Sequence, residues 1–539
     1  MKLIEFSGAR RTPLVGRQDL LEEAERRIGR GGVHLLYLEG SGGIGKTAVL
    51  EAILERSQWG GRVETLSGCC VAHDIVDLSD VEVYTPEGLI RKIMEVLGKW
   101  FFQQAQELLP VLDRARLAGD MAAVRQAEKA MQAAFLEELN ALSEDGIVLA
   151  IDGLEVLDQE HDPFQDELGE EAPALSGAAW LFESFLPALK GNVLILLAGR
   201  SRQAPAKVER LQDGNERILI RRVELAPFAL DETSAYLKGV AQVVGRHGDG
   251  DAAARLWAWA EERGEVVHHL TGGRPLLLAL VAEMVAQSWA LPAAFDRPLE
   301  ELQRQGVEHW WPDVEKALIL GIHRTSGPLG ATLRAMAWLR KGATPELLAQ
   351  LLDLRNGDGT LDLHKATGYL DQAAQLALVK VRPGDRRVFL HDEIYSLMDR
   401  YVLQETSEDE REVVYGTILG YYRDLAHDLE RQAERPSPAS GPVRLLLRQT
   451  YVEQMHYQLC YSPPMGFATY FWLAEEALGN GDVEMDMLVR SEFLRTLSAL
   501  RETEVFLGSI PREASLDAAV RGGARSIYMQ RDPAAAFRI

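Results

Sequence analysis

The chain has 539 residues, of which 47% are hydrophobic and 26% are charged, the balance of a folded globular protein. At roughly 100–200 residues per domain, this length predicts about three to four domains. The formal net charge of −23 argues against nucleic acid as a partner, because proteins that neutralise nucleic-acid phosphates carry clustered Lys and Arg.

The sequence shows no feature of a secreted or membrane protein. No apolar stretch reaches the roughly 18 residues that a membrane-spanning helix needs, and the first residues, MKLIEFSGARRTP, lack the apolar core of a signal peptide. The three cysteines, Cys69, Cys70 and Cys460, form neither a disulfide framework nor a CxxC pattern. We therefore expect a cytoplasmic protein with no membrane partner, in which the cysteines are small packing residues.

Short apolar runs alternate with helical stretches over the first 228 residues. Each run is typical of a buried strand in a parallel sheet, and the runs cover residues 33–38, 63–66, 147–151, 193–198 and 218–225. A long helical stretch (86–142) precedes the third run, and an acidic loop (158–174) follows it. The alternation predicts an α/β domain, a parallel sheet with flanking helices, over residues 1–228.

Helical patterns dominate after residue 228. Residues 229–320 predict a helical lid subdomain, and residues 321–403 predict a winged helix. The winged helix is expected to have helices at 330–339, 345–352 and 367–375, then two short strands at 378–382 and 387–390 about a Pro-Gly-Asp turn. Residues 404–539 predict an all-α region, interrupted by a Pro- and Ser-containing linker at 435–442.

The segment that follows the first apolar run matches the P-loop pattern GxxxxGK(S/T). Its glycines let backbone N–H groups close around phosphates, and the helix that follows points its positive end at the anion. Lys46 can reach the β- and γ-phosphates, and the Thr47 hydroxyl can ligate Mg²⁺. The residues expected to contact ATP or ADP here are Gly40, Ser41, Gly42, Gly43, Ile44, Gly45, Lys46, Thr47 and Ala48.

Charged residues follow two of the other apolar runs. Asp152 ends the run IVLAI and can hold Mg²⁺, directly or through water. Glu155, three residues on, is the candidate to polarise the attacking water. Arg200 follows VLILLAG, and because ligands of a parallel sheet sit beyond the carboxyl ends of its strands, we expect it to face the γ-phosphate.

In this order the motifs resemble those of the STAND ATPases, signal transduction ATPases related to the AAA+ proteins that include NACHT and NB-ARC members. The likeness covers residues 12–400. Val15, Gly16 and Arg17 are similar to the family's hhGR segment, which lines the adenine. The sequence IDGLE (151–155) resembles the NACHT form of the Mg²⁺ motif. Gly153 stands where typical AAA+ proteins have a catalytic glutamate, which implies slow hydrolysis.

Three further motifs extend the resemblance. Arg200 is similar to the family's sensor arginine. The sequence LTGGRPL (270–276) resembles the GxP motif of the lid, which implies that Pro275 packs on the adenine. FLHD (389–392) resembles the MHD-type motif with Leu in place of Met. This implies that His391 contacts the β-phosphate of ADP and holds a closed, inactive state.

The resemblance implies an ATP/ADP-dependent switch of signal transduction. The protein would be an autoinhibited monomer with ADP, would self-associate after exchange for ATP, and would be reset by slow hydrolysis. Moving such an equilibrium from 1:99 to 99:1 takes about 5.5 kcal/mol. Several charge-assisted hydrogen bonds to phosphate, at roughly 1.5–3 kcal/mol each, supply that free energy.

The two ends of the sequence lead to further expectations. Only about a dozen residues precede the hhGR segment, so we expect no amino-terminal effector domain in this chain. Residues 524–539 resemble the start of a tetratricopeptide-like helix pair, and one incomplete unit cannot bury its own apolar face. We therefore expect a truncated piece of a longer protein, in which a helical-repeat sensor binds an inducer that the sequence does not name.

Two other functions remain open from the sequence. A DNA-handling AAA+ ATPase or a transcription regulator would place the third helix of the winged helix in the major groove. Residues 366–378 contain no Lys or Arg and include Asp371, a poor composition for contacting phosphates or bases. A scaffold that binds nucleotide without hydrolysing it is the other alternative, because Gly153 takes the place of the usual catalytic glutamate and the role of base then depends on Glu155.

Overall fold

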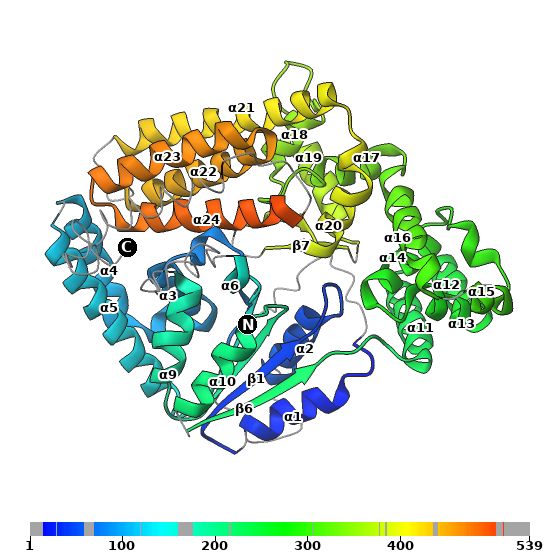
Figure 1. Ribbon diagram of the computed structural model, residues 1–539, viewed down its shortest axis with the longest axis horizontal. Helices are drawn as coiled ribbons and strands as arrows, with labels where there is room; N and C mark the ends of the chain where they lie inside the picture. The colour runs from blue at the N-terminus through cyan, green and yellow to red at the C-terminus, as the bar shows by residue number, and fades with distance from the viewer. Residues whose placement is uncertain are drawn as a thin grey trace. The chain divides into compact units, whose positions relative to one another are not determined.

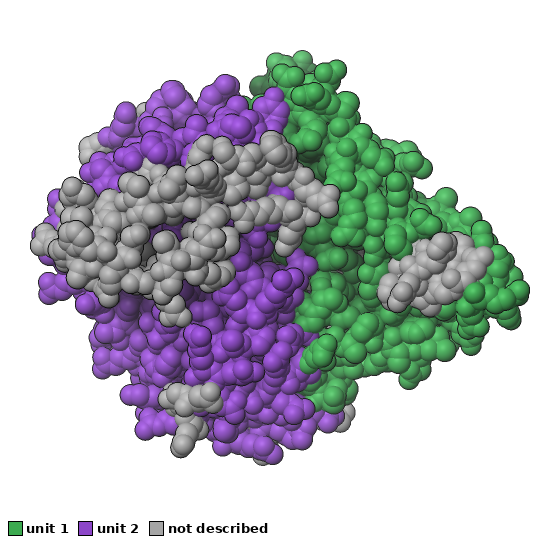
Figure 2. Space-filling model, viewed as in Figure 1, with its two compact units in different colours: residues 1–20, 40–49, 224–421 green, residues 21–39, 50–223, 422–539 purple. Residues whose placement is uncertain are grey.

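The computed structural model describes residues 14–28, 30–58, 69–118, 120–159, 176–214, 217–305, 307–376, 378–382, 385–434, 440–502 and 510. The strand expected at 63–66, most of the acidic loop, and the helix pair expected at 524–539 lie outside these residues. Two compact units are coloured in Figure 2: unit 1 comprises residues 1–20, 40–49 and 224–421, and unit 2 comprises residues 21–39, 50–223 and 422–539. Within the described ranges, no helix has the length and apolar character to cross a membrane.

Unit 2 is built on a parallel sheet, which confirms the predicted fold class. Over the described residues the sheet has six strands in the order β2-β4-β5-β1-β6, with β3 also beside β4. The pairs β1–β5, β4–β5, β2–β4 and β3–β4 are all parallel. The strands are β1 (Val33–Glu39), β2 (Cys70–Val71), β3 (Val76–Asp77), β4 (Ile147–Asp152), β5 (Val193–Gly199) and β6 (Ile218–Glu224).

The burial of the strands explains why the sequence predicted the central ones well. Every residue of β5 is buried, as are all residues of β1 and β4 except the last of each. Strands covered on both faces are apolar throughout and produce continuous hydrophobic runs. Strands β2 and β3 have only two residues each, too few for a recognisable pattern.

The long helical stretch expected at 86–142 is three separate helices. Thr85 caps the first helix, α3 (Pro86–Leu97), which ends where Gly98 adopts a φ of 106°. A short 3₁₀ turn, η3 (Lys99–Phe101), leads into α4 (Gln103–Leu117). Asp120 then caps α5 (Met121–Leu142) by accepting from two backbone amides. A left-handed glycine and a helix-capping aspartate therefore divide what composition alone presents as one helix.

An aromatic cluster packs the α4–α5 hairpin against the helices that precede β5. Phe135 on α5 lies 5.5 Å from Phe102 and 6.1 Å from Phe185, measured between ring centroids. Trp180 joins the cluster at 5.6 Å from Phe185. The segments that flank this cluster and the sheet are α6 (Val156–Gln159), α8 (Gly177–Trp180), η4 (Leu181–Phe185), α9 (Leu186–Ala188) and α10 (Ala204–Gly214).

The carboxyl-terminal helices form a bundle, drawn in orange tones in Figure 1, whose hydrophobic core also includes Val81 and Tyr84. After α21 (Glu408–Ala433), the bundle consists of α22 (Ser440–Tyr461), α23 (Pro463–Gly479) and α24 (Val483–Glu502). Tyr470 and Phe493 stack with centroids 4.0 Å apart at its centre. Over the described part of residues 404–539 the all-α prediction is confirmed, although α22 begins at Ser440, inside the linker expected at 435–442.

Unit 1 contains the helices of the predicted lid. They are α11 (Leu230–Arg246), α12 (Gly250–Glu262), α13 (Gly264–Thr271), α14 (Pro275–Ala286), η5 (Ala293–Asp296), α15 (Leu299–Gln305) and α16 (Val307–His323). Helix α14 is apolar around most of its circumference and is buried from Leu277 to its end. It is therefore the central helix of the lid.

The predicted winged helix follows in the same unit. Its elements are α17 (Gly327–Met336), α18 (Pro345–Leu351), α19 (Leu363–Ala373), β7 (Val379–Val381), β8 (Val388–Leu390), α20 (Asp392–Tyr401) and η6 (Leu403–Glu405). Ala343 adds a short antiparallel bridge to Val388 that the sequence did not reveal. Helix α19 begins four residues earlier than expected, because Asp362 caps it by accepting from the Lys365 amide at 2.9 Å.

The cysteines behave as packing residues. All three are free thiols. Burial raises the pKa of the Cys70 thiol to about 11, and burial also raises the pKa of Cys69. Both thiols are therefore protonated near neutral pH and are poor nucleophiles.

Candidate nucleotide-binding site

The P-loop lies between β1 and α2 (Lys46–Gln58), as its sequence predicted. Gly43 and Gly45 have φ values of 69° and 93°, a left-handed conformation that favours glycine. The Lys46 ammonium donates hydrogen bonds to the carbonyls of Gly40 at 2.8 Å and Ser41 at 3.0 Å. This side chain therefore folds back over its own loop, where a phosphate would compete for it.

The lid is hydrogen-bonded directly to the P-loop within unit 1. The Leu276 amide, in the first turn of α14, donates to the Gly43 carbonyl at 3.1 Å. A Cβ added to Gly43 would lie 2.7 Å from the Cβ of Leu276, so a larger residue would push the lid away. Pro275, predicted to pack on adenine, is the first residue of α14 and thus neighbours this contact.

The predicted adenine-side segment packs against the start of the lid. Arg17 donates to the Ala226 carbonyl, and its guanidinium lies 5.4 Å from the centre of the Phe228 ring. Gly16 has a φ of 66°, and a Cβ there would lie 1.7 Å from Oε1 of Glu232. The Phe228 amide in turn donates to the Gly273 carbonyl at 2.8 Å. The hhGR and GxP segments, far apart in the sequence, are thereby joined.

The predicted acidic residues and Arg200 lie at the carboxyl ends of β4 and β5 in unit 2. Oδ1 of Asp152 accepts a hydrogen bond from the Gly153 amide at 2.8 Å. Oε2 of Glu155 accepts from the Arg200 amide at 3.4 Å, and the Arg200 guanidinium lies 4.0 Å from Oε1 of Glu155. The two residues predicted to act on the attacking water and the γ-phosphate are therefore paired with each other.

Two residues that the sequence reasoning missed complete this edge. Asp158 accepts from the Ser201 hydroxyl at 2.8 Å and from the Arg202 amide at 2.7 Å, tying the loop after β4 to the loop after β5. Asp77 ends β3 in register with Asp152. Neither residue has a local sequence signal, because each is recognised only once the strands are paired.

Asp77 occupies the space that Gly153 leaves open. Gly153 has a φ of 84°, and a Cβ there would lie 3.0 Å from Oδ1 of Asp77. The same oxygen accepts from the Ser79 amide at 2.9 Å and the Ser79 hydroxyl at 2.6 Å. A carboxylate from the neighbouring strand thus lies close to the position where AAA+ proteins are expected to have a glutamate.

Magnesium would be held by few protein groups. Among the described residues, no cluster of three or more His, Cys, Asp or Glu side chains could hold a metal ion. A hydroxyl from Thr47 and a carboxylate from Asp152 fit Mg²⁺, which usually takes one or two protein ligands and keeps phosphate oxygens and waters. Thr47 belongs to unit 1 and Asp152 to unit 2, so their joint binding of the ion stays a prediction.

His391 lies between the winged-helix sheet and the helix after it. Its amide donates to the Leu378 carbonyl at 3.0 Å, and its backbone caps α20. Unit 1 contains both His391 and the P-loop. The contact of its imidazole with a β-phosphate stays a prediction from the resemblance.

Comparison with known families supports the P-loop assignment. Residues 13–179 match the family described as AAA ATPase domain. The match includes the P-loop, Asp152 and Glu155 and ends before Arg200. Together with the parallel sheet, it identifies an AAA+ P-loop ATPase fold. No curated protein matches this sequence significantly.

Several solved structures align with large parts of the chain at low similarity. The Aeropyrum pernix ORC2 protein in its ADPNP–ADP complexes is 16% identical, with 73% of this chain and 96% of that chain covered and a TM-score of 0.31. Drosophila ORC bound to DNA is 14% identical, with 74% and 94% covered and a TM-score of 0.29. The Aeropyrum pernix ORC1 protein in complex with DNA is 18% identical, with 75% and 97% covered and a TM-score of 0.25. Scores this low carry no weight for the function of this chain.

Proposed function

We propose that this protein is an ATP/ADP-dependent switch of signal transduction. It is autoinhibited with ADP, is activated by exchange for ATP and consequent self-association, and is reset by slow hydrolysis. Lys46, Thr47 and Asp152 hold the phosphates and Mg²⁺, and Glu155 with Arg200 acts at the γ-phosphate. His391 senses the β-phosphate of ADP.

The hydrogen bond between Leu276 and Gly43 is the observation that carries this proposal. The loop expected to surround the phosphates is also the loop that holds the first turn of the lid helix α14, at 3.1 Å. A ligand shifts a conformational equilibrium only through its differential affinity for the two states. A γ-phosphate that rearranges this loop would act on the lid directly, which gives ATP and ADP a physical means of favouring different lid positions.

A partly buried ion pair continues this connection toward the winged helix. Arg274, just before Pro275, donates to Oε1 of Glu315 on α16 at 2.5 Å. The Tyr401 hydroxyl, at the end of α20, donates to Oε2 of the same carboxylate at 3.3 Å. We call Arg274, Glu315 and Tyr401 the Glu315 latch. It joins the residue beside the lid motif to the helix that follows His391, entirely within unit 1.

Weakening the Glu315 latch is expected to speed the release of ADP. Glu315→Gln keeps the shape of the side chain but removes the charge that holds Arg274, a loss of about 1.5 kcal/mol for a hydrogen bond to a charged group. We therefore expect ADP to leave roughly tenfold faster, since 1.4 kcal/mol corresponds to a factor of ten. Stopped-flow fluorescence of a labelled ADP measures this rate.

Glu300→Gln on α15 is the matched control, because Glu300 is exposed and its loss should leave the release rate unchanged. Equal release rates for Glu315→Gln and the wild-type protein would show that the latch does not restrain the nucleotide.

Self-association provides the direct test of the switch. Light scattering after size-exclusion chromatography should give a monomer mass with ADP and a larger mass with a non-hydrolysable ATP analogue. A monomer in both nucleotides would contradict activation by assembly.

DNA handling is the first alternative function. Helix α19 would be the groove-reading helix. It begins at Leu363 and therefore includes Lys365, which precedes the segment 366–378 considered from the sequence. The Lys365 ammonium lies 5.9 Å from the centre of the Tyr369 ring. One lysine with Asp371 on the same helix is a weak basis for phosphate contacts. DNA binding that weakens steeply with salt would favour this alternative, and no binding at low salt would exclude it.

A nucleotide-binding scaffold is the second alternative. Glu155 is engaged by Arg200, and a base must be able to reach the attacking water. Single-turnover hydrolysis by the wild-type protein and by Glu155→Gln separates the possibilities. Hydrolysis that is lost only in the variant assigns the base to Glu155, and no hydrolysis in either protein indicates a scaffold.

A further inference from the structure

Helix α24 of the carboxyl-terminal bundle contacts the segment that follows strand β3. Arg495 donates from Nη1 to the Leu78 carbonyl at 2.9 Å, and its guanidinium lies 3.6 Å from the centre of the Tyr84 ring. The arginine is buried, with 7% of its surface exposed. The contact joins residues 417 positions apart within unit 2.

Leu78 is in turn bonded to the backbone of Asp152. The Leu78 amide donates to the Asp152 carbonyl at 3.0 Å. The preceding residue, Asp77, is in register with Asp152 across the β3–β4 pair. Leu78 is therefore held on one side by the Mg²⁺-binding candidate and on the other by Arg495. A shift of α24 would act on Asp152 through a single residue.

A second buried contact fixes α24 to the same segment. The Tyr84 hydroxyl donates to Oε2 of Glu492 at 2.8 Å and lies 3.3 Å from the Ser79 carbonyl. The other oxygen of Glu492 accepts from Thr496 at 2.9 Å and lies 2.8 Å from Nδ1 of His456 on α22. Glu492 is 1% exposed. Buried polar groups this fully bonded favour one arrangement of the helix.

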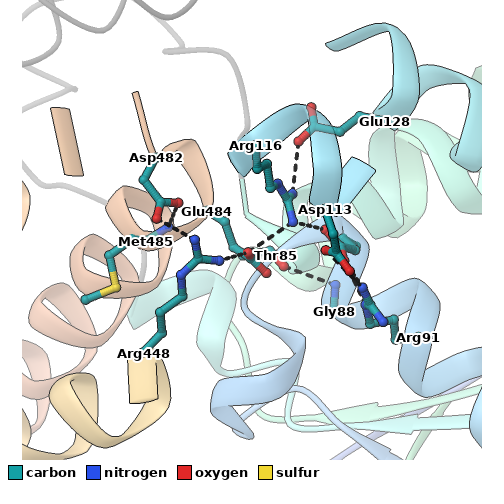
Figure 3. A network of polar contacts seen from close by, with 11 residues as sticks. Thr85, Gly88, Arg91, Asp113, Arg116, Glu128, Arg448, Asp482, Glu484 and Met485 are labelled. Atoms are coloured by element: carbon teal, nitrogen blue, oxygen red, sulfur yellow. Dashed lines mark hydrogen bonds and ion pairs between the residues drawn. The ribbon is translucent and has the colours of Figure 1, made fainter. Parts of the chain in front are cut away.

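A charged network anchors the other end of α24, as Figure 3 shows. Nη1 of Arg116 on α4 lies 2.6 Å from Oε2 of Glu87 and 3.1 Å from Oε2 of Glu484 on α24. Arg448 on α22 contacts both Glu484 and Asp482. We call Arg116, Glu87, Glu484 and Arg448 the Arg116 network. With two anchors along its length, α24 is fixed in position over residues 78–84.

We infer that Arg495 is a positioning residue for ATP hydrolysis, through which the α22–α24 bundle completes the acidic edge. The inference rests on the proposed function, since it assumes that Asp152 holds Mg²⁺. Arg495 restrains Leu78, Leu78 restrains the end of β4, and the Asp152 carboxylate is thereby kept in place before the nucleotide arrives. Preorganisation of this kind accelerates the chemical step, because the groups need not be ordered during the reaction.

The inference gives the bundle a defined role. A displacement of α24 by an event elsewhere in the carboxyl-terminal region would lower the turnover rate and leave nucleotide affinity largely intact. The lifetime of the ATP-bound state would then depend on whether the bundle is docked.

The test uses the full chain with Arg495→Met and Arg495→Lys, and Arg431→Met as the control. Arg431 lies on α21 with 65% of its side chain exposed. We expect Arg495→Met to lower kcat at least tenfold with KM for ATP within about twofold, and to raise the Mg²⁺ concentration needed for half-maximal rate. Lysine can still donate to the Leu78 carbonyl, so Arg495→Lys should recover part of the rate. The Arg431→Met variant should match the wild-type protein.

Hydrogen exchange of the Leu78 amide gives a readout that does not depend on hydrolysis. Exchange should be at least tenfold faster in Arg495→Met than in the wild-type protein and intermediate in Arg495→Lys. If the methionine variant does not fold, the lysine variant alone tests the inference, and exchange equal to that of the wild-type protein would count against it. A wild-type protein that hydrolyses ATP, together with variants whose kcat is unchanged or increased, would overturn the inference and leave the proposed function standing. A wild-type protein without turnover would instead contradict the slow ATP hydrolysis that the proposed function includes.

Discussion

Replacing Lys46 by methionine is expected to reduce nucleotide affinity roughly 100-fold. Lys46 would give the β- and γ-phosphates charge-assisted hydrogen bonds worth about 1.5–3 kcal/mol each, and each 1.4 kcal/mol is a factor of ten in affinity. Methionine keeps the length and packing of the side chain. Equilibrium titration with labelled ADP and labelled ATP measures the loss.

The control for this change is Lys190→Met, at an exposed lysine after α9. It should bind nucleotide like the wild-type protein. If Lys46→Met bound nucleotide as tightly as the wild-type protein, the glycine-rich segment would be a turn without a ligand. That result would contradict the assignment of this segment as the phosphate-binding loop. Circular dichroism of both variants distinguishes lost binding from lost folding.

Replacing Arg116 by methionine is expected to destabilise the docking of the carboxyl-terminal bundle by about 3 kcal/mol, the lower end of the cost of breaking a buried ion pair. Glu87 and Glu484 are both buried beside Arg116, with 5% and 7% of their side chains exposed. Removing the guanidinium takes away the cation that lies between the two buried carboxylates and leaves each with a single arginine, Arg91 beside Glu87 and Arg448 beside Glu484. Hydrogen exchange of the α24 amides and the urea midpoint of unfolding measure the effect.

The defect of Arg116→Met should depend on pH in a defined direction. Burial alone would raise the pKa of Glu87, but the charges of Arg116 and Arg91 outweigh it and hold that pKa below its usual range. Burial and the nearby Glu87 carboxylate raise the pKa of Glu484. Without Arg116 both pKa values should rise, because only Arg91 then offsets the burial of Glu87 and only Arg448 that of Glu484. A rise in a folded-state pKa costs stability as the pH increases through it, so the stability lost in the variant should grow with pH.

We therefore expect the difference between Arg116→Met and the wild-type protein to be larger at pH 8 than at pH 5. The control is Lys129→Met, at an exposed position on α5, which should change neither the exchange of α24 nor its pH dependence. A destabilisation below about 1 kcal/mol at pH 8 would place this network among surface ion pairs of little energetic value.

The P-loop residues, Asp152 and Arg200 lie on the elements that the sequence predicted, and their roles in a nucleotide site stay predictions. The P-loop occupies eight successive residues after a buried strand, and its strand–turn–helix context is confirmed. Asp152 is the last residue of β4, after five buried apolar residues, and Arg200 directly follows β5, so their places at the strand ends could be deduced from hydrophobicity alone. Local chemistry and strand burial are both properties that a single sequence displays.

The parts built from distant residues could not be predicted. Asp77 lies on a strand of two residues, whose partner is known only from the register with Asp152. Glu315 meets Arg274 from 41 positions away, and Arg495 meets Leu78 from 417 positions away. Such contacts depend on tertiary packing, because no sequence periodicity specifies which buried polar groups will meet.

One boundary error also has a clear physical cause. The helical stretch expected at 86–142 was judged by its content of helix-forming residues, which continues across Gly98 and Asp120. A glycine with positive φ and a capping aspartate end and start helices whatever their neighbours prefer. Gly98 and Asp120 could have been recognised in the sequence as helix-ending and helix-starting residues, but the prediction gave more weight to the helix-forming residues around them.

The nucleotide that the purified protein carries tests the central claim most directly. The full chain is purified without added nucleotide and denatured, and the released compound is identified and quantified by chromatography. The account predicts about one ADP per chain in the wild-type protein and far less in Glu315→Gln, because a closed lid retains ADP. A wild-type protein that releases no nucleotide, and that exchanges and hydrolyses ATP rapidly, would contradict the switch and indicate an ordinary cycling ATPase.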